Sequence, residues 1–421
     1  MNINESKLGP SDTIKKNIIE NFYLLIPFMC IGLWALFCLI MKNFNLVTGD
    51  FRVFYFAGKQ IFDDPSKLYD VSGYLYFPSA ALFFSVYISI YPLYIGSWIL
   101  FITNFVFAVI FIIEFNKILT LMDIKKRFHR FLFLIIISNG WIVFRQFYYN
   151  QTKFLAIFLL IFIIRREIQW RKLDKVKQTK FYLLNYGLMV FLIALSPYLI
   201  FLLIIYMFQD ISLKNIFQKE TIIKFTIIIG MFIIQNLLFL IYPNLLFDFL
   251  INSLNFRRNI LMIFYLKEFI YLNSMAISLV KFITISIVVF VTLLLIFNRN
   301  LRIELKFSIF CMCFILLDAI RGEAILIILL PLILLLFVPF LNQNQTDFIK
   351  NNIVVLIGMM SVSAIAFSSY TEYRTFFRLF PFLDDFPFYL IVYLRSIFFL
   401  IITVTSLILL YYKDSKKLRN L

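Results

Sequence analysis

Histidine and cysteine are scarce in this chain. Its 421 residues include one histidine, His129, in a basic connector, and four cysteines, all of them inside apolar runs. Cys311 and Cys313 are two positions apart, so on a helix they point in different directions. The sequence therefore favours buried thiols over a disulfide or a metal site. No chemistry that depends on histidine is expected.

Charged residues are also few. They make up 15% of the chain, against 62% hydrophobic residues, which is outside the range of soluble globular proteins. Apolar runs long enough to cross about 30 Å of hydrocarbon recur from end to end. The sequence predicts an all-α, polytopic membrane protein with a single integral membrane domain over residues 1–421.

The sequence lacks the motifs of two common kinds of nucleotide-binding site. The chain has neither a phosphate-binding glycine loop nor a dinucleotide-binding glycine fingerprint. The net charge of +17 comes from Lys and Arg in connectors between apolar runs, where such residues set membrane orientation. We therefore expect no nucleic-acid partner, no metal and no cofactor.

About twelve helices are expected, the first two at residues 21–42 and 96–117 and the last two at 353–367 and 388–412. Three later apolar stretches are interrupted by polar residues, at 145–153, 196–197 and 318–323. A charge at mid-membrane costs about 2.5–3.5 kcal/mol. This cost predicts two short helices with a turn between them in the first and last of these stretches, and Pro197 predicts the break in the middle one, because proline lacks a backbone donor and disfavours helix at the preceding residue.

The orientation follows from the same connectors. Most Lys and Arg fall on the side that also holds residues 1–20 and the basic tail 413–421, which predicts cytosolic termini in a multi-pass cell-membrane protein. The large loop 43–95 then faces outward, and its apolar part, 78–91, is expected to lie in the membrane interface.

This first outer loop carries the candidate chemistry. Asp50 follows the first helix and is read either as a general base at the water–lipid boundary or as an ordinary carboxylate at a helix end, with Arg52 beside it. Asp63, Asp64 and Pro65 indicate a turn. The loop tyrosines are predicted either to stack on a sugar or to pack at the interface: Tyr55, Tyr69, Tyr74 and Tyr76.

Outward-facing cations are candidates for binding a phosphate, to which Arg offers paired donors. An internal ion pair, such as Arg321 with Asp318 or Glu323, is the alternative. The cations are Arg145, Lys153, Arg257, Arg258, Arg321, Arg374 and Arg378.

A run of short motifs resembles glycosyltransferase family 87, a family of GT-C-type membrane enzymes. Asn150-Gln151 is similar to the family's Gly-Gln turn, and Ser196-Pro197 stands where the family usually has Lys-Pro. The late turn 318–323 lacks the histidine that relatives often carry there. The remaining motifs are Asp50, Tyr55, Ala57, Asp64-Pro65, Leu68-Tyr69, Tyr76, Pro78, Trp98, Asn104 and Asn273-Ser274.

The resemblance implies a GT-C-like bundle and a sugar donor on polyprenyl phosphate. It implies that mannose, another hexose or a pentose passes to a lipid or glycan acceptor on the outer face. The family's catalytic carboxylate falls on Asp50, and the turn residue Gln151 falls among the substrate-binding residues. A polytopic transporter or lipid flippase, and an envelope polysaccharide polymerase or ligase, remain alternatives. The sequence predicts no oligomeric state.

Overall fold

The computed structural model describes residues 22–124, 127–170, 178–208, 219–257, 286–287, 289–298, 301–317, 323–338, 357–358, 360–362 and 401. Within these residues every element is helical and no strand occurs, so the predicted all-α class is confirmed for the described chain. The helices expected at 353–367 and 388–412 lie almost entirely outside the described residues.

The N-terminal half begins with an apolar helix, and the outer loop that follows it is itself helical. The elements up to residue 121 are η2 (Phe22–Leu24), α2 (Leu25–Met41), α3 (Gly49–Asp63), η3 (Pro65–Asp70), α4 (Pro78–Phe84), the π-helical turn η4 (Ser85–Ser89) and α5 (Leu93–Leu121).

Shorter helices follow. They are α6 (Arg127–Ser138), α7 (Trp141–Tyr148), α8 (Lys153–Trp170), α9 (Gln178–Leu195), η6 (Pro197–Leu199), α10 (Ile200–Met207), α11 (Lys219–Gln235), α12 (Leu238–Ile241), α13 (Asn244–Arg257), α16 (Ile303–Leu317) and α17 (Glu323–Leu335).

Two described helices are long and apolar enough to cross a membrane. They are Phe22–Met41, formed by η2 with α2, and α5. The helices Arg127–Ser138 and Ile142–Tyr148 meet at a bend of 42° and provide a third span if the pair crosses as one. On α2 the residues turned away from the rest of the chain are large and apolar, including Met29, Leu33 and Leu36, which is the pattern of a lipid-facing helix.

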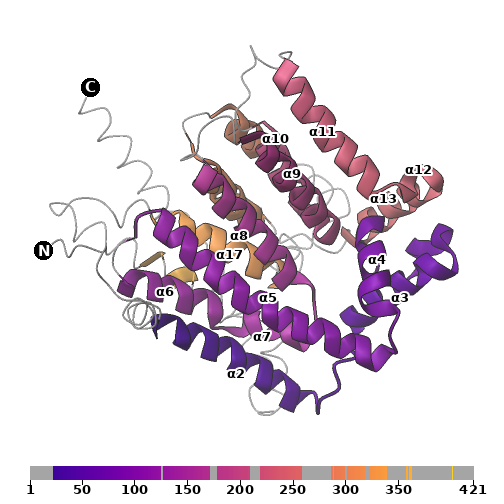
Figure 1. Ribbon diagram of the computed structural model, residues 1–421, viewed down its shortest axis with the longest axis horizontal. Coiled ribbons are helices and arrows are strands. Elements are labelled where there is room, and N and C mark those ends of the chain that lie inside the picture. The colour runs from indigo at the N-terminus through magenta and orange to yellow at the C-terminus, as the bar shows by residue number, and fades with distance from the viewer. Residues whose placement is uncertain are drawn as a thin grey trace, which may run out of the picture.

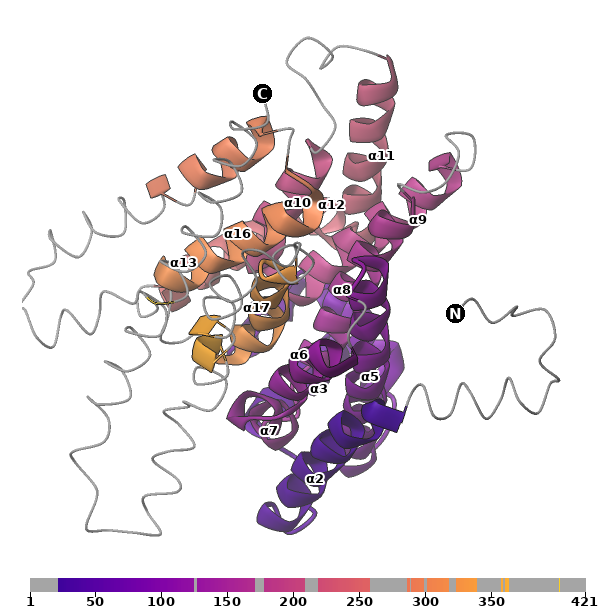
Figure 2. The ribbon, with the colours of Figure 1, turned by 90° about the vertical axis from the view of Figure 1, so that its left-hand side faces the viewer.

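The pair α5 and α8, which run in the same direction, forms the centre of the fold (Figure 1). Phe107 of α5 stacks on Phe158 of α8 with ring centroids 5.1 Å apart. α2 packs on one side, where Trp34 contacts Phe144 of α7, and α9 followed by α11 packs on the other. Figure 2 shows α16 and α17 beside α8 in a view turned by 90°.

The break in the stretch 131–164 differs from the predicted one. Residues 145–153 were expected to form the turn, but α7 continues through Tyr148, and α8 begins at Lys153. A further break falls at Gly140, whose φ of 142° suits a residue without a Cβ. Arg145 therefore lies within α7, and its guanidinium rests 5.1 Å from the centroid of the Tyr149 ring.

Two other predicted breaks are confirmed. Ser196-Pro197 separates α9 from η6, as expected where Pro disfavours a helical conformation at the preceding residue. The turn at Asp64-Pro65 ends α3, and the Asp64 side chain accepts a hydrogen bond from the Ser66 amide at 3.1 Å.

Candidate functional site

Asp50 lies in the first turn of α3, and Thr48 fixes the start of that helix. The Thr48 Oγ1 atom accepts a hydrogen bond from the Phe51 amide at 3.2 Å, as an N-cap residue does. The same hydroxyl donates to the Tyr149 carbonyl oxygen at 2.6 Å. One side chain thus joins the N-terminus of α3 to the turn between α7 and α8. The helix N-terminus also favours the negative charge of Asp50.

The turn between α7 and α8 is held in an unusual backbone conformation. Asn150 has a φ of 49°, a left-handed conformation that Asn adopts more readily than most residues. Its side-chain amide donates to the Ser97 carbonyl at 2.8 Å and accepts from Asn104 at 3.2 Å. Both partners belong to α5, so the turn is anchored on the central helix pair.

This anchored turn brings Gln151 to Asp50. The Gln151 amide nitrogen Nε2 donates a hydrogen bond to the Asp50 carboxylate oxygen Oδ2. Asp50 is half-buried and Gln151 is buried. Among the described residues no other hydrogen bond or ion pair is made by this carboxylate, which leaves its Oδ1 atom to accept from a ligand.

A buried cation stands next to this pair. Lys153, the first residue of α8, has 5% of its surface exposed. Its Nζ atom lies 5.3 Å from the centroid of the Tyr76 ring, a cation–π arrangement, and 3.5 Å from the Ser196 hydroxyl, at the limit of a hydrogen bond. Four segments distant in sequence therefore meet here: the start of α3, the residues before α4, the α7–α8 turn and the α9–η6 break.

The charge of Asp50 acts on both neighbours. Burial lowers the pKa of the Lys153 ammonium to about 8, and the Asp50 carboxylate opposes that change. Burial raises the pKa of the Tyr76 hydroxyl, and the Asp50 charge raises it further. Lys153 thus carries its positive charge at neutral pH but loses it in mildly alkaline solution.

Tyr76 is held by aromatic neighbours. Its ring centroid lies 5.1 Å from Phe54 and 5.7 Å from Tyr74, and its carbonyl accepts a hydrogen bond from the Tyr69 hydroxyl at 2.9 Å. Because Phe54 belongs to α3, the helix that carries Asp50 also supports the ring beneath Lys153.

Other predicted binding residues do not join this group. Tyr55 is buried, and its hydroxyl donates to the Tyr91 carbonyl at 2.8 Å, so it packs the loop against α5. Arg52 is exposed on the first turn of α3, and Arg145 is half-buried on α7. Arg257 is the last residue of α13. Arg258 and Arg321, like Arg374 and Arg378, lie outside the described residues.

Several residues that build the site were not singled out from the sequence. Thr48 carries a recognisable signal, since a Thr just before a helix start is a preferred N-cap. Gln146 in α7 and Thr152 in the following turn carry none, because nothing local marks a buried Gln or Thr as functional. No three His, Cys, Asp or Glu side chains gather as a metal-binding group within the described ranges.

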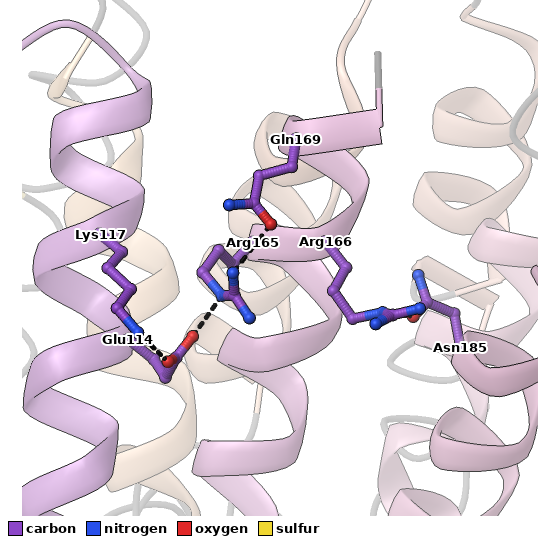
Figure 3. Close-up of polar contacts among 6 residues, drawn as sticks. All are labelled: Glu114, Lys117, Arg165, Arg166, Gln169 and Asn185. Carbon is purple, nitrogen blue, oxygen red and sulfur yellow. Dashed lines mark hydrogen bonds and ion pairs between the residues drawn. The ribbon is translucent and has the colours of Figure 1, made fainter. Parts of the chain in front are cut away.

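A second polar cluster lies at the opposite ends of α5 and α8 (Figure 3). The buried carboxylate of Glu114 pairs with Lys117 at 2.8 Å and with the Arg165 guanidinium. Arg165 also donates to Gln169 at 2.8 Å. This arrangement joins α5 to α8 through a carboxylate whose two oxygens both have cationic partners, as a buried charge requires.

The neighbouring residues of α8 extend the cluster to α9 and α10. Arg166 donates to the Asn185 side-chain oxygen at 2.7 Å, and the Asn185 amide donates to Glu167 at 2.9 Å. The Tyr206 hydroxyl donates to the same Glu167 oxygen. Glu114 thus has a cationic partner at each oxygen and Glu167 accepts two hydrogen bonds at one oxygen, whereas Asp50 accepts a single hydrogen bond from the described residues.

Comparison with known proteins found no relative: no family model, no curated protein and no solved structure matches the chain.

Proposed function

We propose that this chain is a membrane glycosyltransferase that moves a sugar from a polyprenyl-phosphate donor to a lipid or glycan acceptor. The observation that carries the proposal is the juxtaposition of an oriented carboxylate, Asp50 held by Gln151, with a buried ammonium, Lys153, over the Tyr76 ring. Transfer from a sugar phosphate needs a base for the acceptor and a cation for the leaving phosphate, and this group has both.

Asp50 is the general base in this proposal. The acceptor hydroxyl attacks the anomeric carbon while its proton passes to Asp50 Oδ1. The bond between the anomeric carbon and the phosphate oxygen breaks, and its electron pair leaves with the polyprenyl phosphate. Direct displacement inverts the anomeric centre through an oxocarbenium-like transition state. No acid is needed, because a charge-neutralised phosphate is a fair leaving group.

Lys153 is the cation that receives the phosphate. Its ammonium is buried at the start of α8, close enough to Asp50 to feel the charge of that carboxylate, so it can meet a phosphate on a sugar that the base faces. A phosphate oxygen and a charged nitrogen form a stronger hydrogen bond than two neutral groups do. Arg145 and Arg52 flank the same end of the fold and add to its positive potential, and no cofactor is invoked.

A lipid-linked donor also needs an apolar approach. α4, η4 and the residue that follows η4 expose the large apolar side chains Leu82, Val86 and Ile90 at a spacing of four residues, close after Tyr76 in sequence. Residues four apart lie near one another on a helical surface. Ile95 and Ile102 expose further apolar surface on α5, the membrane-span candidate that comes next. This surface supports entry of the prenyl chain from the lipid side.

The same proposal includes the topology. The chain is a multi-pass protein of the cell membrane with about twelve helices in a GT-C-like bundle. Both termini are in the cytosol and residues 43–95 lie on the extracytoplasmic face. The described helices that can span a membrane support the membrane location, and the resemblance of the loop motifs to glycosyltransferase family 87 supports the bundle.

The test is reconstitution of the full chain in liposomes with a panel of prenyl-phosphate sugars and extracted membrane lipids as acceptors. The proposal predicts release of prenyl phosphate together with a product heavier by one hexose or pentose in the mass spectrum. Movement of a labelled solute or lipid across the bilayer with no covalent change would replace the proposal with a transporter.

A further inference from the structure

The turn beside Asp50 holds several buried polar atoms without hydrogen-bond partners. Both side-chain atoms of Gln146, the Oε1 atom of Gln151 and the hydroxyl of Thr152 are inaccessible to solvent and contact no donor or acceptor in the described residues. Gln146 and Thr152 are 0% and 1% exposed. Four hydrogen-bonding atoms in seven residues thus remain unsatisfied.

These atoms belong to one small region. The backbone N–H of Gln151 donates a hydrogen bond to the backbone carbonyl of Gln146 at 3.0 Å, so the two residues are adjacent at the end of α7. Thr152 follows Gln151 directly and precedes Lys153. The other end of the Gln151 side chain contacts Asp50. The unsatisfied atoms therefore belong to the short segment 146–152, which supplies the donor to the proposed base and directly precedes the proposed phosphate cation.

Packing alone does not account for these residue types. A buried polar group without a partner costs about 1–3 kcal/mol, and a Leu or Val of similar size avoids that cost. Nearly all buried polar groups in folded proteins have a partner, in protein or in water. Gln146 is 0% exposed, and a fully buried position is ordinarily filled by an apolar side chain.

The chemistry of these atoms fits hydroxyl groups. A Gln amide presents a donor and an acceptor side by side, and a Thr hydroxyl is both. A sugar hydroxyl likewise donates once and accepts, so two neighbouring ring hydroxyls match an amide edge. A phosphate alone, which only accepts, leaves the two Gln oxygens unsatisfied.

We propose that Gln146 and Thr152, with the Oε1 atom of Gln151, form the subsite that binds the hydroxyls of the transferred sugar. This inference rests on the proposed function and deepens it. The subsite holds the sugar ring between the base and the phosphate cation, and it distinguishes a glycosylated lipid phosphate from the bare lipid phosphate that remains after transfer.

The test measures binding rather than turnover. Affinities of the purified full chain are compared for farnesyl phosphate and for farnesyl phosphate carrying mannose, glucose or arabinose. The ratio of the affinity with the sugar to the affinity without it gives the contribution of the sugar to binding. For the parent protein we expect at least one sugar to improve affinity about tenfold or more, and for Gln146→Leu and Thr152→Val we expect that ratio to fall about tenfold with farnesyl phosphate affinity unchanged.

Gln169→Leu, the same substitution at the far end of α8, is the matched control and should leave the ratio unchanged. An unchanged ratio in both site variants, or no sugar-dependent affinity in the parent protein, overturns the subsite and indicates that buried water satisfies these atoms. If Gln146→Leu fails to fold, Thr152→Val decides alone. Asp50→Asn distinguishes a failure of the subsite from a failure of the proposed function. The subsite predicts that a sugar still improves the affinity of this variant for farnesyl phosphate, whether or not turnover is lost.

Discussion

The amide of Gln151 donates a hydrogen bond to the carboxylate of Asp50, although 101 residues separate them in sequence. The contact exists because Thr48 ties the start of α3 to the Tyr149 carbonyl, and because Asn150 ties the same turn to α5. Three hydrogen bonds from different segments thus converge on the orientation of one carboxylate. The predictions below separate the roles of the residues that make them.

Gln151 is a positioning residue for the base. Gln151→Leu removes the donor to Asp50 and allows the carboxylate to rotate, and displacement of a reacting group by about 1 Å costs on the order of 100-fold in rate. We expect kcat to fall by about 10- to 100-fold, measured in reconstituted liposomes, and the KM for the donor to rise as well, because the same side chain loses its Oε1 contact with the sugar. Gln60→Leu, on the same helix as Asp50, should leave kcat unchanged. An equal loss in both variants would indicate general instability.

Lys153 makes donor capture depend on pH. Its pKa is lowered to about 8, so the ammonium is charged below that pH and neutral above it. The value of kcat/KM, which reports the free enzyme, should therefore decline as the pH rises through about 8. Lys153→Arg keeps its charge and should remove this decline even if its rate is lower. A decline that persists in the Arg variant would assign the alkaline limb to another group.

Asn150 stabilises the turn between α7 and α8 in two ways, by adopting a left-handed backbone conformation and by its side-chain hydrogen bonds. A left-handed residue other than Gly or Asn is strained by about 1–2 kcal/mol. Asn150→Ala loses both the conformation and the contacts with Ser97 and Asn104, whereas Asn150→Gly loses only the contacts. We expect Asn150→Gly to be more stable than Asn150→Ala by about 1 kcal/mol. Apparent Tm in detergent gives the order, and equal values would contradict the assigned backbone conformation.

The cluster in Figure 3 stabilises the helix packing and takes no part in the proposed chemistry. Glu114→Leu leaves Arg165 without its carboxylate and should destabilise the protein by about 3–5 kcal/mol. Lys117→Ala removes an exposed partner of the same carboxylate and should cost less than about 1 kcal/mol. Thermal unfolding compares the two variants. A stable Glu114→Leu variant with lost activity would instead assign this cluster a functional role.

Local signals in the sequence predicted much of the helical framework. The apolar run of the first helix, the Pro197 break and the Asp64-Pro65 turn each depend on neighbouring residues, and each appears in the structure. The turn before α8 was placed less well. A charged residue marks a break only if it lacks a partner, and the contact of Arg145 with Tyr149 cannot be read from composition.

The candidate site was only partly predictable for a related reason. Asp50 and Lys153 are visible as charged residues among apolar ones, and Gln151 came from a resemblance to a family motif. Which of the loop tyrosines faces them depends on long-range packing: Tyr55 packs inward against the Tyr91 carbonyl, while Tyr76 lies under Lys153. The buried amide of Gln146 leaves no mark on the sequence pattern at all.

The most direct test of the central claim is the rate of sugar transfer by Asp50→Asn, which preserves the size of the side chain and removes the base. A general base contributes about 100- to 10,000-fold to a rate. In single-turnover experiments with donor bound beforehand, the account predicts a loss of this size together with donor affinity close to that of the parent protein. Transfer at the parent rate by the Asn variant would contradict it.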